Sequence, residues 1–255
     1  MTLPLTRETI QRLAKECKSV DWKNAETIAQ LQARQYSDPR SREYANHGLG
    51  RRLQFIGRSI EFIFEVTPPD AKLVSIDQSA HASIIVQSHI TNVFGALDNL
   101  ARIWVYENSM RRDDGRSIPE TWFGMGPGNK FVRSSLPSNA KRFLEDSSEW
   151  FKYLESFRHS LAHRIPLYVP HATISDVDAE RAAQDLTETQ NDAIKSGNLG
   201  AYSKALHEQA ALGEFIPIII HSYSEGSPII YYHGQMLNDL HTVIDLTNMV
   251  LASLP

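Results

Sequence analysis

The chain has 255 residues, of which 42% are hydrophobic, 22% are charged and 9% are aromatic, and its formal net charge is -4. This composition is that of a globular protein, and it excludes both a disordered chain and the broad positive field of a nonspecific nucleic-acid binder. With one cysteine, Cys17, the chain forms no intramolecular disulfide, and it has neither a secretory signal pattern nor an apolar run of about 18 residues. We therefore expect a cytoplasmic protein with no membrane partner.

The first part of the chain is predicted to be helical. Four helices are expected, at about 6–17, 21–36, 41–66 and 74–111. Thr6 can cap the first of them, and Pro68 and Pro69 end the third, because proline has no backbone donor to continue a helix. In the fourth, apolar residues recur at steps of three and four residues, the pattern of a helix with a buried face. A long central helix is the strongest of these predictions.

A loop longer than most connections in compact domains is predicted at 113–137. Its segment Gly124–Lys130 resembles a phosphate-binding loop only in its glycines, since it lacks the Gly-Lys-Ser/Thr ending and a preceding strand. Trp122, Phe123 and Phe131 could stack on nucleic-acid bases. Anchoring of a loop to the core is the commoner use of such aromatics, and it is the use that we predict here.

The second half is predicted to be mainly helical as well. We expect a short helix from about 138 to 144 and then a helix that ends near Pro166. A polar insertion at 171–212 should contain two helices, at about 176–195 and 202–212. Strands at 215–223 and 228–232 should flank the turn Ser224–Ser227, and a last helix should follow at 236–254. The predicted fold is thus mainly α, a single helical domain over 1–255. It is a bundle with a long central helix and one small β-hairpin near the C-terminus.

The segment from Glu149 to Pro166 says most about function. Trp150, Leu154, Phe157 and Leu161 are spaced to lie on one face of a helix. Next to this apolar face, four ionisable residues fall within seven positions: Arg158, His159, His163 and Arg164. Such a density of charge beside a buried seam indicates a candidate site.

Arg158 and His163 are the residue types that metal-independent RNA cleavage needs. An imidazole can take the proton of a ribose 2′-hydroxyl, and a guanidinium can stabilise the phosphoryl charge through two hydrogen bonds. Residues five apart on an ideal helix are separated by about 140°. The two groups therefore meet only if the helix end is distorted, if the arginine reaches round the helix, or if a second subunit supplies one of them.

Several alternatives compete with this interpretation. Arg42 and His47 have the same spacing, so Arg158 and His163 could equally be a helix end whose side chains meet solvent or carbonyl groups. His159 and His163 are placed to share a metal, but two ligands are too few, and we expect no metal and no cofactor. Ser160 follows His159 without an evident orienting acid, which argues against serine hydrolysis.

Other polar residues have no predicted role in the site. Five histidines are expected at the surface or in the hairpin: His81, His89, His171, His221 and His233. Three polar residues of the long central helix either contact the motif or face water: Asp98, Asn99 and Arg102.

The segment from Phe157 to His163 resembles the signature of the HEPN superfamily, which is an arginine, then commonly Asn, Asp or His, and then a histidine. The resemblance implies a helical protein that dimerises with the motif facing across the dimer cleft, and it assigns Arg158, His163 and His159 as catalytic residues. We accordingly expect a homodimer that is a metal-independent endoribonuclease or a module that binds RNA or nucleotides, with no DNA partner. The alternative is a noncatalytic helical protein that binds a partner or a ligand.

Overall fold

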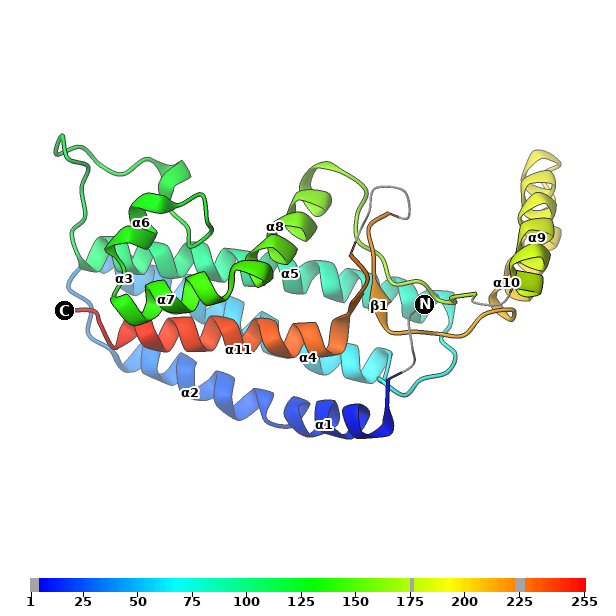
Figure 1. The fold of residues 1–255 in the computed structure, drawn as a ribbon, viewed down its shortest axis with the longest axis horizontal. Helices are drawn as coiled ribbons and strands as arrows, with labels where there is room; N and C mark the ends of the chain where they lie inside the picture. The colour runs from blue at the N-terminus through cyan, green and yellow to red at the C-terminus, as the bar shows by residue number, and fades with distance from the viewer. Residues whose placement is uncertain (1–4, 175–176, 223–227) are drawn as a thin grey trace.

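The computed structural model describes residues 5–174, 177–222 and 228–255, and for His163 it describes the backbone only. The fold is mainly α with one small antiparallel β-pair near the C-terminus, which confirms the predicted fold class (Figure 1). Its helical elements are α1 Arg7–Cys17, α2 Val20–Ala33, α3 Pro39–Glu43, η1 Tyr44–Leu49, α4 Gly50–Val66, α5 Ile76–Glu107, η2 Glu120–Trp122, α6 Lys130–Ser135, α7 Ser138–Asp146, α8 Ser148–His163, α9 Val177–Lys195, α10 Leu199–Ala210 and α11 Tyr232–Leu251. The strands are β1 Ile218–Ile219 and β2 Ile230–Tyr231.

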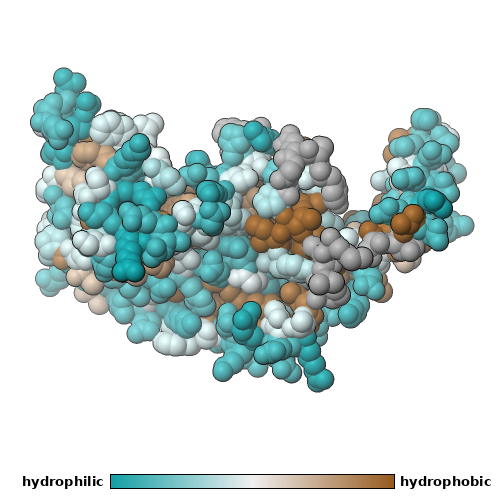
Figure 2. Space-filling view, viewed as in Figure 1, coloured by the Kyte–Doolittle hydropathy of each residue, from teal (hydrophilic) through white to brown (hydrophobic). Residues whose placement is uncertain are grey.

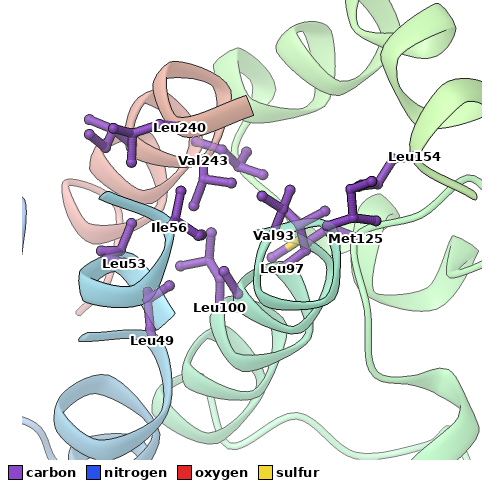
Figure 3. Close-up of a cluster of buried hydrophobic side chains, with 14 of the residues drawn as sticks. Leu49, Leu53, Ile56, Val93, Leu97, Leu100, Met125, Leu154, Leu240 and Val243 are labelled. Atoms are coloured by element: carbon purple, nitrogen blue, oxygen red, sulfur yellow. The ribbon is translucent and has the colours of Figure 1, made fainter. Parts of the chain in front are cut away.

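Four helices, α2, α4, α5 and α11, pack against one another as a bundle. Their apolar faces meet in one core, where side chains of α4, α5 and α11 interdigitate (Figure 3). α1 continues along the same side and contacts α4 and α11, and α8 lies across α5. The core is built as the periodicity of the sequence predicted, with the least exposed positions at three- and four-residue steps on each helix.

The long central helix is confirmed as α5, which spans 32 residues. Its start is fixed by a capping box, in which Ser75 Oγ accepts from the Gln78 amide at 3.1 Å and Gln78 Oε1 accepts from the Ser75 amide at 2.9 Å. It ends at Glu107, two residues before Ser109, whose φ of 48° does not continue a right-handed helix.

The predicted third helix is interrupted. The segment 39–66 forms α3, a π-helical turn η1 and then α4. In the π-helical turn, Gly48 lies against Asn99 of α5, so closely that a Cβ on Gly48 would lie 3.0 Å from the Asn99 side chain. The extra residue in the wide turn thus coincides with a close approach of two helices, which apolar periodicity alone does not predict.

The segment predicted as a long loop contains two short helices, η2 and α6. It is tied to the core by Met125, which is 1% exposed and reaches the side chains of α5 and α8 (Figure 3), and by Phe123, which is 9% exposed. Anchoring is therefore confirmed for Phe123, and for Phe131, which is half-buried and packs against the core. The same prediction is wrong for Trp122, which is 39% exposed.

Helices α9 and α10 confirm the helices predicted between 176 and 212, and they pack against each other. Together they stand away from the bundle as a mostly hydrophilic arm (Figures 1 and 2). The two chain segments at the base of this arm are joined by Thr173 and Glu214, which exchange backbone hydrogen bonds of 2.8 and 3.0 Å.

The β-pair is shorter than predicted, with two residues in each strand. Its second strand ends where α11 begins, and α11 starts at Tyr232, four residues before the predicted start. The predicted turn Ser224–Ser227 lies outside the described residues. Within the described part of the chain, no helix has both the length and the apolar character of a membrane span.

Candidate functional site

Helix α8 carries the candidate site, and its apolar face is the one that the sequence predicted. Trp150, Leu154 and Phe157 are 9%, 0% and 0% exposed, and Leu161 is half-buried. Packing of this face against the bundle fixes the direction of the polar residues on α8. Arg158 and His159, near its C-terminal end, are exposed.

The N-terminal half of α8 is joined to α11 through a buried carboxylate. Trp150 Nε1 donates to Asp239 Oδ1 at 2.7 Å, and the Tyr153 hydroxyl donates to Asp239 Oδ2 at 3.3 Å. Gln235 Nε2 donates to the same carboxylate at 2.7 Å. Burial and the negative charge of Asp239 raise the pKa of Tyr153 well above its ordinary value. Donors from two helices thus surround a carboxylate that water does not reach.

Two further polar side chains extend this cluster. His89 Nδ1 lies 2.8 Å from Ser59 Oγ, and His89 Nε2 lies 3.3 Å from Asp239 Oδ2 at an angle that gives no hydrogen bond. The set combines the residue types of a serine hydrolase, but the side chains of His89 and Asp239 are 0% exposed, and the Ser59 hydroxyl donates to the Ile56 carbonyl oxygen at 2.7 Å. A nucleophile without access to substrate has no catalytic use, and this cluster therefore stabilises the fold.

The surface or hairpin placement predicted for two histidines is wrong, because His89 and His233 are 0% exposed and lie in α5 and α11. His221 is also buried, at 4% exposed, but it lies in the segment predicted as the first strand of the hairpin. Position within the apolar pattern could have identified the first of them, because His89 lies three residues after Val86 and four before Val93 on the buried face of α5. Asp239 lies in the buried pattern of α11 in the same way.

The C-terminal half of α8 borders an open concavity of about 550 Å³. Its lining comes from α5, α8 and the residue that follows α8: Phe94, Lys152, Glu155, Ser156, Arg158, His159 and Arg164. Three of these side chains are cations and one is a carboxylate. In a chain with an overall charge of -4, the concavity is therefore a local cationic surface.

Arg158 lies over Phe94 of α5, one helical turn from Asp98 on the same helix. Its guanidinium carbon lies 4.2 Å from the centroid of the Phe94 ring, within the range of a cation–π contact. Asp98 is half-buried next to it, and burial raises the pKa of that carboxyl. Three positive charges oppose the rise, those of Arg158, Arg102 and Arg52. The charge of Arg158 thus acts on Asp98 without an ion pair between the two side chains.

The other two polar residues singled out on the central helix serve different neighbours. Asn99 is 8% exposed and packs against Gly48. Arg102 pairs with Glu120 at 2.5 Å, and its guanidinium carbon lies 4.5 Å from the centroid of the Phe123 ring. Asn99 therefore ties η1 to α5, and Arg102 ties the 108–129 segment to α5. Neither side chain faces open water.

The structure brings Arg158 and His159 to one concavity, while the side chain of His163, at the end of α8, lies outside the described residues. Of the competing pair, His47 lines a separate concavity of about 470 Å³ and lies 3.2 Å from Arg51, whereas Arg42 is not part of that lining. The concavity of Arg158 differs from that of His47 in combining three cations with a histidine.

Sequence reasoning gave no part in the site to Phe94 or Lys152, which also line the concavity. It counted Arg164 among the ionisable residues of the candidate site but gave it no role. Phe94 comes from another helix, and only the crossing of α5 and α8 places it under Arg158.

Among the described residues, no group of three or more histidine, cysteine, aspartate or glutamate side chains is placed to hold a metal ion. Comparison of the chain with family models, curated proteins and solved structures found no match.

Proposed function

We propose that the concavity at the C-terminal end of α8 binds the phosphodiester backbone of RNA, and that the protein is a HEPN-like, metal-independent endoribonuclease that acts as a homodimer. The observation that carries the proposal is the gathering of Arg158, Arg164 and Lys152 with His159 around one open surface of an otherwise acidic chain. Such a surface attracts phosphate, which arginine binds with two parallel hydrogen bonds.

In this proposal, Arg158 binds a non-bridging phosphate oxygen and stabilises the charge that develops on the phosphoryl group. His163 takes the proton of the ribose 2′-hydroxyl, whose oxygen attacks phosphorus, and His159 supports the reaction at the same phosphate. The bond to the 5′-oxygen breaks, and that oxygen takes up a proton. The products carry a 2′,3′-cyclic phosphate and a 5′-hydroxyl, so a 2′-deoxy substrate cannot react.

The dimer supplies the geometry. Because residues five apart point about 140° from each other on a helix, Arg158 of one protomer and His163 of its partner are better placed to meet than the two within one chain. A twofold axis near the end of α8 would form two such composite sites.

The test is RNA degradation by the purified protein in the presence of a chelator. We expect Arg158→Ala and His163→Ala to abolish cleavage with little change in thermal stability. Arg42→Ala and His47→Ala, which remove the pair of equal spacing, are the matched controls and should cleave as the wild type does. No cleavage by the wild-type protein would overturn the enzymatic proposal and favour a noncatalytic role, in which Arg158 on Phe94 is a structural contact.

Mixing two inactive variants tests the composite site. In a heterodimer of Arg158→Ala and His163→Ala protomers, one of the two sites has both residues intact. Random exchange should therefore restore about a quarter of the wild-type rate. A mixture that stays as inactive as either variant alone would place both residues of each site in one protomer.

A further inference from the structure

A second pocket, called here the Trp122–Phe131 pocket, has none of the proposed catalytic residues in its lining. It has a volume of about 480 Å³, within the usual range for small-molecule sites, and is lined by Thr121, Trp122, Gly128, Asn129, Lys130, Phe131 and Ser134. The centroids of its two aromatic rings are 5.4 Å apart, with 46° between the ring planes. The rings therefore form one aromatic wall that is open to solvent.

The segment that presents Trp122 is held in one shape. Asn129 Nδ2 donates to the carbonyl oxygens of Trp122 and Phe123, both at 3.2 Å. Gly124 has a φ of 146°, and a Cβ there would lie 2.6 Å from Asn129 Oδ1. With Met125 and Phe123 in the core, the exposure of Trp122 is thus imposed by a rigid support. A surface aromatic fixed in advance binds a planar partner with little further loss of entropy.

Two cations lie beside this aromatic wall. Lys130 is part of the pocket lining, and the guanidinium carbon of Arg112 lies 5.5 Å from the centroid of the Trp122 ring. Hydroxyls of Thr121 and Ser134 add polar groups at the same place. An aromatic wall with neighbouring positive charge is the arrangement that stacks a base while attracting the phosphate attached to it.

The pocket belongs to the same loop that reaches α8. A Cβ on Gly126 would lie 3.1 Å from Glu155 Oε1, and Glu155 lines the concavity of Arg158. Figure 1 shows α6, α7 and α8 following one another along the molecule. One loop thus joins the aromatic pocket to the cationic concavity.

We infer that the Trp122–Phe131 pocket binds a nucleobase with its attached phosphate. The choice of ligand rests on the proposed RNA-directed function, whereas the pocket itself is defined by its own residues. The base stacks on the aromatic wall, and Lys130 receives the phosphate. The same chemistry is offered by a free nucleotide and by a single-stranded RNA, and the experiment separates these two sources.

The experiment titrates the protein with adenosine monophosphate, with ribose 5-phosphate and with a short oligoadenylate, and follows binding by isothermal titration calorimetry. We expect binding of the two base-containing probes, none of ribose 5-phosphate, and binding about tenfold or more weaker in Trp122→Ala and Phe131→Ala. Trp122→Phe should retain most of the affinity. Trp22→Ala removes a tryptophan that is 59% exposed on α2 and is the matched control. Tighter binding of the oligonucleotide than of the mononucleotide would identify RNA as the source, and equal binding would identify a free nucleotide.

Unchanged affinity in folded Trp122→Ala, or equal binding of ribose 5-phosphate, would overturn the inference. The binding titration and the RNA cleavage assay are repeated with Arg158→Ala. If that variant still binds the base probes while the wild type cleaves no RNA, the pocket stands and the ribonuclease proposal fails. If the wild type cleaves RNA and Trp122→Ala binds and cleaves equally well, the opposite holds.

Discussion

Two groups of polar side chains on α8 have opposite surroundings. In the N-terminal half, Trp150 and Tyr153 donate to Asp239, a carboxylate that is fully buried between α8 and α11. In the C-terminal half, Arg158 and His159 are exposed around an open concavity. One helix therefore carries a polar cluster closed by the protein itself and a polar cluster that faces outward.

The buried polar side chains of α8 should therefore matter for stability, and the exposed ones for function. A buried polar group that has lost its partner destabilises the folded state by the full cost of its desolvation. Changes in the closed cluster should therefore lower the free energy of unfolding. Exposed charges in water contribute little to folding. Changes at the open end should instead alter what the protein binds.

The largest expected effect is that of Asp239→Ala. The substitution leaves the buried donor of Trp150 and the half-buried donor of Gln235 without their acceptor, and it should lower the free energy of unfolding by about 3 to 5 kcal/mol. Denaturant unfolding measures the change. Asp245→Ala, at an exposed position of the same helix, is the control and should change stability by less than about 0.5 kcal/mol. Similar losses in the two variants would show that the buried cluster has no special role.

The next effect concerns pH. Burial lowers the pKa of His233 to about 3, and its Nε2 donates to the Thr67 carbonyl oxygen at 2.8 Å. As the pH falls below the unfolded-state pKa of 6.5, the unfolded chain takes up a proton that folded His233 does not accept. Stability should therefore fall by about 3 kcal/mol between pH 7 and pH 4 from this residue. His233→Gln should flatten the profile over that window, and a variant with the wild-type slope would contradict the assignment.

A smaller loss is expected for Trp150→Phe. The ring remains in the core, but the buried carboxylate of Asp239 loses one of its donors at 2.7 Å. A hydrogen bond to a charged group contributes about 1.5 to 3 kcal/mol, and thermal and denaturant unfolding should show a loss in that range. Trp22→Phe, on the exposed side of α2, should unfold as the wild type does. A loss of the same size there would assign the effect to the ring rather than to the hydrogen bond.

The smallest effect on stability is expected at the open end. Arg158→Ala removes the contact with Phe94, which should cost no more than about 1 kcal/mol for an exposed cation–π pair. The same variant should lose RNA cleavage. If unfolding shows a loss as large as that of Asp239→Ala, Arg158 belongs to the closed cluster, and the contrast between the two halves of α8 does not hold.

Much of the fold followed from the sequence because it depends on local patterns. The capping residue Ser75 and the apolar steps along α5 act within one helix, so the long central helix could be predicted to within a few residues. The π-helical turn at Tyr44–Leu49 depends on how closely Gly48 approaches Asn99, and no local pattern carries that information. The shortness of the β-pair has a similar origin, since α11 starts at Tyr232 and takes over the residues that follow β2.

At the candidate site, the apolar face of α8, and hence the exposure of Arg158 and His159, could be predicted from the order of the residues. Three features came instead from the way distant segments pack: Phe94 lies under Arg158, Trp150 closes off Asp239, and Trp122 faces solvent while Phe123 is buried. The spacing of a residue along the chain sets the side of the helix on which it lies, whereas the partner that it meets there is set by the packing of segments far apart in sequence.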